Sequence, residues 1–201
     1  MKPIYKVLLI IFGAFLLIMF AAYYFVAGNY NSMVAKDVAV KSAWAQVENN
    51  YQRRADLIPS LVETIKGSAK FEQETLKQVM EARASATSVK IDPSNITPEQ
   101  LAKFQSAQNQ AGGAISRLLA VAENYPQLKT TEAFQGLMNE LAGTENRISF
   151  ARKTFNESVQ DYNLTIKKFP GNIVAGFFGF QEKAFFQADA GTNKPVVPNF
   201  N

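Results

Sequence analysis

The chain has 201 residues, of which 47% are hydrophobic, a formal net charge of +4, and neither histidine nor cysteine. This length and hydrophobic fraction predict one folded domain with a substantial core. The missing residue types exclude imidazole general bases, thiolate nucleophiles and the metal sites built from them, and the scattered basic residues form no nucleic-acid motif. We therefore expect no cofactor, metal, nucleic acid or small-molecule substrate.

The first segment is long and apolar enough to cross a membrane. Residues 7–26, VLLIIFGAFLLIMFAAYYFV, carry no charge, and about 20 helical residues rising about 1.5 Å each cover the ~30 Å hydrocarbon core. A cleaved signal peptide is the alternative, but the apolar run is longer than usual, and cleavage after Ala27 places Phe25 where a small residue belongs. We expect an uncleaved anchor over residues 1–29. Lysines near both ends leave its orientation open, with a slight bias toward a domain outside the cytoplasm.

A long helix is predicted next, from Asn31 to Ser88, where the turn residues that follow end it. Apolar side chains recur along it at helical spacing, and their stripe changes face part of the way along. The first part of the stripe comprises Val40, Trp44, Val47, Tyr51, Ile58, Leu61 and Ile65, and the second comprises Ala69, Leu76, Val79 and Met80.

The stretch YQRRADLIPSL, residues 51–61, interrupts this helix. Arg54 occupies a position of the apolar stripe, and Pro59 has no amide to donate to the carbonyl of Ala55. Either the helix continues with a kink and a nearby arginine satisfies that carbonyl, or it breaks and Asp56 caps a new helix. Both alternatives predict a change of direction near residue 56.

Two more helices follow, each with apolar side chains at coiled-coil spacing. The first begins at Thr97 with the residues of a capping box and a proline at its first position, and it ends before Pro126. Its stripe comprises Leu101, Phe104, Gln108, Ala111, Ile115, Leu118, Ala122 and Tyr125. The second runs from Thr131 to Phe169, with a seven-residue repeat of Phe134, Leu141, Ile148, Phe155, Tyr162 and Phe169.

The short connections at 89–97 and 126–130 make neighbouring helices antiparallel. The expected fold is therefore all-α: an N-terminal transmembrane helix, then an antiparallel, coiled-coil-like bundle of three to four long helices over residues 30–186, with an aromatic C-terminal segment. Residues 187–201 are expected to form a loose polar tail.

Polar residues gather around the interrupted stretch in this arrangement. Antiparallel counting makes Glu123 and Tyr125 neighbours of the arginine pair, where a charge-assisted pair can form. Two further charged residues lie beside the apolar stripe of the last helix. The cluster is either an internal contact that fixes helix register or a contact site for a partner. Its members are Arg53, Arg54, Asp56, Pro59, Glu123, Tyr125, Glu145 and Arg147.

The segment FPGNIVAGFFGFQEKAFF concentrates aromatic side chains among glycines. So much aromatic area requires a partner surface. Three alternatives stay open: packing back on the bundle, contact with the membrane interface, or docking of another copy. The residues concerned are Phe177, Phe178, Phe180, Phe185 and Phe186.

Four blocks, RRADLIPSLVETIKG, AENYPQLKTTEAFQGLMNELAGTENRI, ARKTFNESVQDYN and FPGNIVAGFFGF, occur in an order that resembles the LemA family, from about Tyr30 to Phe186. The resemblance implies a bacterial, single-pass protein with an N-terminal anchor and a bundle of long helices. It implies no settled enzymatic activity. Some relatives take part in forming membrane organelles or accompany TPM-domain proteins, which suggests assembly or partner binding at a membrane.

We therefore expect a protein that is not an enzyme: a scaffold or partner-binding protein of the bacterial cell envelope. Its expected location is the inner, cytoplasmic membrane, with the folded domain on the extracytoplasmic side. Its expected partners are the membrane and either a second copy of the chain or another membrane protein. The alternative is a lipid-interacting or membrane-shaping protein that uses the aromatic segment.

Overall fold

The computed structural model describes residues 3–66 and 73–187. Every regular element in this part of the chain is a helix. In chain order these are α1 (Pro3–Lys66), α2 (Gln73–Ser88), α3 (Pro98–Ala122), α4 (Pro126–Lys129), α5 (Glu132–Lys167) and α6 (Gly171–Phe178).

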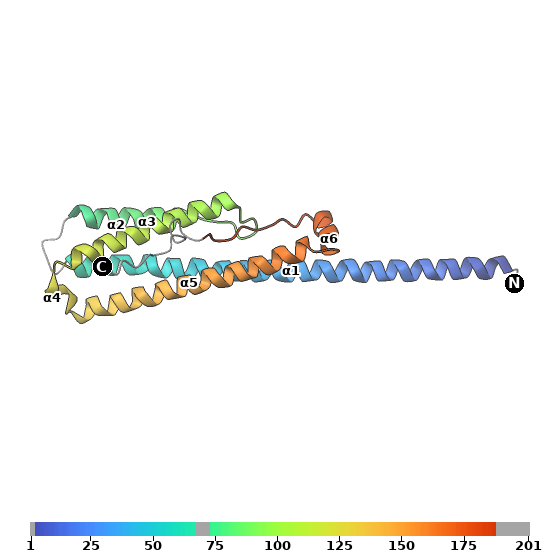
Figure 1. The fold of residues 1–201 in the computed structure, drawn as a ribbon, viewed down its shortest axis with the longest axis horizontal. Helices are drawn as coiled ribbons and strands as arrows, with labels where there is room; N and C mark the ends of the chain where they lie inside the picture. The colour runs from blue at the N-terminus through green and yellow to red at the C-terminus, as the bar shows by residue number, and fades with distance from the viewer. Residues whose placement is uncertain (1–2, 67–72, 188–201) are drawn as a thin grey trace, which may run out of the picture.

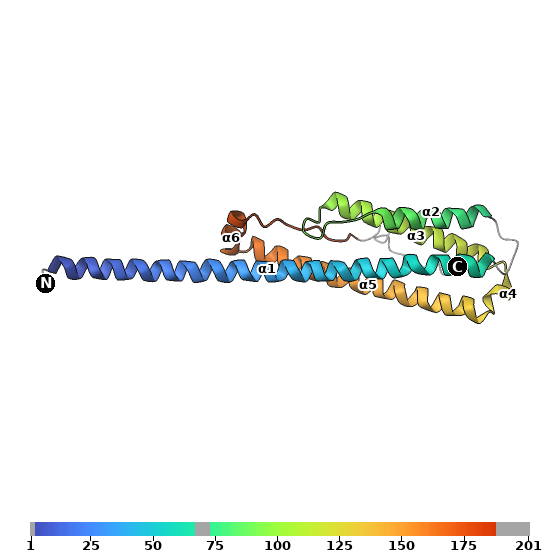
Figure 2. The ribbon, with the colours of Figure 1, turned by 180° about the vertical axis from the view of Figure 1, so that it is seen from behind.

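Four long helices form an elongated antiparallel bundle. Helix α1 packs mainly on α5, and α2 packs mainly on α3, so the bundle consists of two helix pairs laid side by side (Figure 1). The N-terminal part of α1 extends far beyond one end of the bundle without a neighbour (Figures 1 and 2). The predicted all-α fold, with an N-terminal apolar helix and an antiparallel bundle, is confirmed.

The projecting part of α1 contains the apolar segment. From Ile4 to Tyr30 no side chain is buried, although almost all are apolar. The segment is helical throughout and is long and apolar enough to cross a membrane. Because it is continuous with the bundle half of α1, the same helix can serve as membrane span and as scaffold of the folded domain.

The predicted helix from Asn31 to Ser88 is wrong in its boundaries. Helix α1 continues through residue 56 without a change of direction (Figure 1) and ends at Lys66. Helix α2, which runs antiparallel to α1, starts at Gln73. The apolar stripe changes face because two antiparallel helices carry it, and not because one helix bends. Ala69, predicted in that stripe, lies outside the described residues.

Pro59 is accommodated inside α1 by a side chain from α2. The carbonyl of Ala55, which lacks its usual intrahelical donor, accepts a hydrogen bond from Arg83 Nε at 2.7 Å. Arg83 also forms an ion pair with Asp56 at 3.7 Å. The alternative in which an arginine satisfies the carbonyl is therefore the correct one, and the expected kink is absent because the helix pairs hold α1 on both sides of Pro59.

The core has two clusters along the bundle. One surrounds Trp44, whose ring centroid lies 5.2 Å from that of Phe104 and 5.4 Å from that of Phe155. The other surrounds Ile58 and Leu118. The predicted stripes supply residues to both clusters, with Met80, which is 37% exposed, and Phe169 as exceptions. Phe169 is 81% exposed because α5 ends at Lys167.

After α6 the chain returns along the bundle in an extended segment, residues 180–187, which we call the strap. Two asparagines of α5, one heptad apart, hold its backbone: Asn163 pairs with both the N–H and the carbonyl of Lys183 at 3.0 and 2.9 Å. Asn156 pairs in the same way with Phe186 at 2.9 and 3.1 Å. These bonds seat the ring of Phe186 in the core against Trp44.

Candidate functional site

Arg54 lies at the centre of the bundle, at the junction of the helix pairs. Its side chain is only 7% exposed. Its Nη1 donates to Glu145 Oε1 of α5 at 3.1 Å. Its Nη2 donates to the carbonyl and the side-chain oxygen of Gln108 in α3, at 2.9 and 2.7 Å. The guanidinium also lies over the ring of Tyr51, 5.0 Å from its centroid. This buried charge is therefore hydrogen-bonded and paired, as burial of an arginine requires.

The contacts of Arg54 extend through α3 to α2. A Cβ atom placed on Gly112 would lie at an ordinary contact distance, 3.7 Å, from Arg54 Nη1, so the guanidinium packs directly on α3 at this glycine. Gln108 carries the network further, because its Nε2 donates to the carbonyl of Ala86 in α2 at 3.2 Å. One arginine thus connects α1, α3 and α5 directly and reaches α2 through Gln108.

A groove opens above Arg54, between α3 and α5. These two helices hardly contact each other, and the space between them has a volume of about 460 Å³. Tyr51 and Arg54 form its floor. The apolar part of its walls comprises Ile115, Leu119, Met138, Leu141 and Ile148. The groove can therefore accept an apolar side chain together with a polar or acidic group.

Glu145 stands at the edge of this groove, with 48% of its side chain exposed. It is the carboxylate that pairs with Arg54. Because a half-exposed carboxylate can turn to solvent, an acidic group from another molecule could replace it on the guanidinium. We call this groove, floored by Arg54 and edged by Glu145, the arginine groove.

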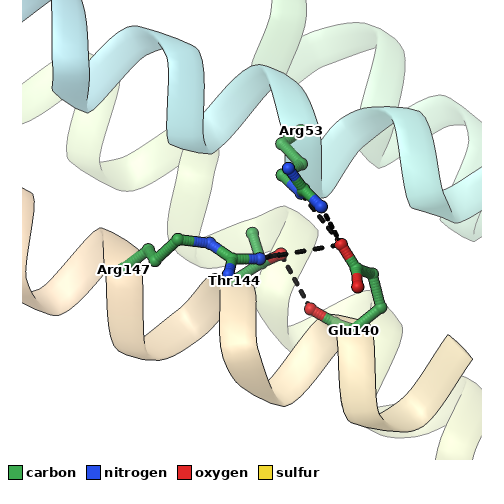
Figure 3. Close-up of polar contacts among 4 residues, drawn as sticks. All are labelled: Arg53, Glu140, Thr144 and Arg147. Atoms are coloured by element: carbon green, nitrogen blue, oxygen red, sulfur yellow. Dashed lines mark hydrogen bonds and ion pairs between the residues drawn. The ribbon is translucent and has the colours of Figure 1, made fainter. Parts of the chain in front are cut away.

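A second polar network lies on the outside of the bundle, between α1 and α5. Arg53 donates to Glu140, and Arg147 lies 3.7 Å from the same carboxylate (Figure 3). Arg147 also donates to the hydroxyl of Thr144 at 3.2 Å. The hydrogen bond from Arg53, and then its charge, lower the pKa of Glu140 below the ordinary value of 4.5, with a smaller contribution from Arg147. Arg53 and Arg147, both members of the predicted polar cluster, therefore share Glu140, a partner that the sequence did not indicate.

Glu123, which was predicted to pair with the arginines, lies elsewhere. It is exposed at the C-cap of α3. Since α1 does not bend at residue 56, Arg54 lies level with Gln108, which precedes Glu123 by a rise of about 22 Å along α3. Tyr125 forms the N-cap of α4 and packs against the Ile58 cluster. Gln108 is the partner of Arg54 in α3. Its place as a polar residue in an apolar stripe is the sequence signal that indicates this role.

Sequence reasoning missed a buried lysine at the other end of the bundle. Lys183 of the strap is 4% exposed. Its Nζ lies 2.9 Å from Asp37 of α1 and donates to the carbonyls of Pro93 and Ser94 at 3.1 and 2.9 Å. Lys183 therefore joins α1 and the α2–α3 connection to the strap. No local pattern indicates this role, because every partner is distant in sequence.

The charges around Lys183 shift the pKa values of two neighbours. Burial opposes ionisation of Asp37, but hydrogen bonds from Lys41 and Lys183, and their charges, outweigh it and hold the pKa of Asp37 below 3.8. Burial, and then the charge of Asp37, raise the pKa of Tyr162 to about 12. At neutral pH both shifts favour an ionised Asp37 beside the two lysines and an uncharged Tyr162, which indicates a structural cluster.

A larger depression of about 940 Å³ lies between α2 and α3. Its lining consists mainly of amide, hydroxyl and small side chains, including Gln78, Ser106 and Asn109. It has no buried charge at its floor, so the smaller arginine groove offers the stronger recognition chemistry. Within residues 3–66 and 73–187, no three Asp or Glu side chains gather as a metal site would require.

The comparisons with known proteins identify the family of this chain. The sequence model of the LemA family matches residues 43–200. The chain is 26% identical over 186 residues to "Magnetosome protein MamQ 2" of Paramagnetospirillum magneticum, which covers 84% of this chain and 68% of that protein. "Protein LemA" of Metamycoplasma hominis is 24% identical over 178 residues, 88% of this chain and 78% of its own length. The family match takes in the whole arginine groove and the strap, and the chain belongs to the LemA family.

Proposed function

We propose that this protein is a non-catalytic, membrane-anchored scaffold of the bacterial envelope that binds a partner in the arginine groove. The observation that carries the proposal is the buried guanidinium of Arg54 at the floor of an open groove, with a half-exposed carboxylate as its ion-pair partner. A purely structural ion pair needs no such opening beside it. The side chains lining the groove include no histidine or cysteine, which favours binding over turnover.

The chemistry of the groove defines the partner. An acidic side chain can pair with Arg54, and apolar side chains on either side can fill the space beside Leu119 and Leu141. An amphipathic helix or an extended segment of a membrane protein has this combination. A second copy of the chain is included in this class, and the proposed location is the cytoplasmic membrane with the bundle on its outer side.

Crosslinking in intact cells tests the scaffold proposal. The chain has no cysteine, so Ser116→Cys places a single attachment point on the α3 wall of the groove. Ser106→Cys is the matched control, because it lies on the same helix and faces the depression between α2 and α3. A photoactivatable label should yield an adduct of one defined mass from position 116 that position 106 does not give. Equal labelling from both positions, or no adduct from position 116, contradicts the proposal.

The mass of that adduct also separates the partners. Twice the mass of the chain indicates self-association, and any other mass indicates a different protein. The variant Arg54→Met in the Ser116→Cys background should reduce the adduct, since an acidic partner would lose its cation.

A second candidate function is direct action on lipid, favoured by the exposed aromatic residues Phe177 and Phe178. Liposome binding by the chain without residues 1–29 tests it. No side chain that precedes Met33 is buried among the described residues, so this deletion removes none of the core. Binding and deformation of liposomes would support the second candidate, and a chain that stays in solution would contradict it.

A further inference from the structure

Helix α6 is packed against α1 where α1 leaves the bundle (Figures 1 and 2). Val174 and Ala175 form its buried face, and the ring of Phe178 lies 4.8 Å from that of Tyr30. Its first residue, Gly171, fits closely, because a Cβ atom there would lie 2.6 Å from the carbonyl oxygen of Thr165 and 3.2 Å from Met33 Cε. The position of α6 along α1 is therefore fixed at residues 30–33.

This position coincides with the edge of a bilayer crossed by α1. The apolar segment of residues 7–26 ends at Val26, shortly before the polar Asn29, and the four steps from Val26 to Tyr30 rise about 6 Å. The headgroup layer on each side of a ~30 Å hydrocarbon core is about 5–7 Å thick. If residues 7–26 span the membrane, residues 30–33 lie about 6–10 Å beyond the hydrocarbon core, and α6 lies at the outer edge of the headgroup layer.

The face of α6 that points away from the bundle is apolar. Ile173 and Phe177, one turn apart, are 63% and 84% exposed, and Phe169 just before the helix is 81% exposed. Lys168 is exposed beside them and has no ion-pair partner among the described residues. An aromatic and aliphatic face bordered by a lysine is the composition of a helix that lies in a membrane interface.

We propose that α6, with Phe169, is a second membrane contact of this protein, which inserts Phe169, Ile173 and Phe177 into the interface of the bilayer that α1 crosses. One helix across a membrane leaves the domain free to rotate and tilt. A second contact beside it fixes which face of the bundle points along the membrane and at what height the arginine groove stands. This inference rests on the proposed membrane anchoring by α1, and it requires neither a partner in the groove nor membrane shaping.

Site-directed spin labelling of the full chain in liposomes tests the contact. The absence of cysteine makes each single-cysteine variant specific. Gly176→Cys places the label beside Phe177, and nothing within 4 Å obstructs a Cβ there. Ser149→Cys is the matched water control, an exposed position beside the exposed Phe150 on the flank of α5. Gly13→Cys, which is also unobstructed, is the control inside the span.

The readout is collision of the nitroxide with oxygen, which concentrates in lipid, relative to a water-soluble nickel complex. The label at 176 should show the oxygen-to-nickel ratio of the interface, between the high ratio at 13 and the low ratio at 149. Phe177→Ser in the Gly176→Cys background should shift the ratio toward that at 149.

Each other outcome overturns the inference. A label at 176 that is as accessible to nickel as the label at 149 shows that α6 faces water. A label protected from both reagents shows that protein covers α6. If the label at 13 also lies in water, the anchoring by α1 fails, which distinguishes that failure from failure of the α6 contact alone.

Discussion

At the scale of single residues, the bundle depends on charged groups that several helices share. Arg54 bonds to α3 and α5, and Lys183 bonds to α1 and to the α2–α3 connection. Both side chains are buried, and a buried charge without its partners lowers the stability of the fold. Removing one member of such a network therefore leaves buried polar groups unsatisfied.

We expect Arg54→Met to lower the free energy of unfolding by about 1–3 kcal/mol, because the buried side-chain oxygen of Gln108 loses its donor while the methionine keeps most of the packing. Urea denaturation of the purified chain measures this change. Arg53→Met is the control, since that arginine is exposed and its ion pair contributes little. Equal effects of the two substitutions would contradict the central role of Arg54.

Asp37 makes stability depend on pH in acid. Its pKa lies below 3.8 in the folded chain, so folding favours the ionised form. The stabilisation is present above the ordinary pKa and is lost as the pH falls through the folded value. We expect Asp37→Asn to flatten the decline of stability below about pH 4. Thermal unfolding between pH 2 and pH 6 measures this decline, and an unchanged slope would contradict the coupling of Asp37 to Lys41 and Lys183.

At the scale of elements, α5 is the principal packing element. It carries the seven-residue apolar stripe on one face and the two asparagines that hold the strap. Phe155 is fully buried between Trp44 and Phe186. The helix therefore contributes the core and positions the C-terminal segment on it.

Phe155→Ala should lower the free energy of unfolding by about 3–5 kcal/mol, because it removes a large buried ring and leaves a cavity. Phe150→Ala on the same helix is the control, as its ring is 67% exposed and its loss should change stability little. Chemical denaturation of both variants measures the two changes in the free energy of unfolding. A denaturation midpoint that Phe155→Ala leaves unchanged would remove this residue from the core.

Asn163→Ala should free the strap while the helices stay folded. The amide and carbonyl of Lys183 lose their partners, so hydrogen exchange at residues 183–187 should become faster, with little change in α3. Asn146→Ala, at an exposed position of α5, should change neither. Slow exchange of the strap in the Asn163→Ala variant would show that its packing does not depend on this asparagine.

The sequence predicts the elements well where one local pattern decides them. The capping box at Thr97 and the apolar stripes set α3 and most of α5. The boundary of α1 was not predictable, because Pro59 is tolerated only through Arg83 of another helix. Contacts between distant segments also limit how much of the site the sequence predicts. Arg54 and Glu145 were identified as polar residues beside apolar stripes, but Glu140 and Lys183 gain their roles from contacts between distant segments.

At the scale of the whole molecule, the account depends on α1 as one continuous helix. It contains the apolar segment near the N-terminus, passes α6 at residues 30–33, and continues into the core around Trp44 and Ile58. A rigid connection of this kind would hold the arginine groove at a constant height above the membrane. A cleaved or hinged N-terminal segment would not.

The most direct test of this claim is an electron–electron distance measurement in liposomes between labels at Gly13→Cys and Ala45→Cys. Neither position is buried. The 32 intervening steps predict a narrow distribution centred at about 48 Å for a continuous helix. A broad or much shorter distribution, or recovery of a chain that has lost the label at position 13, would contradict the account.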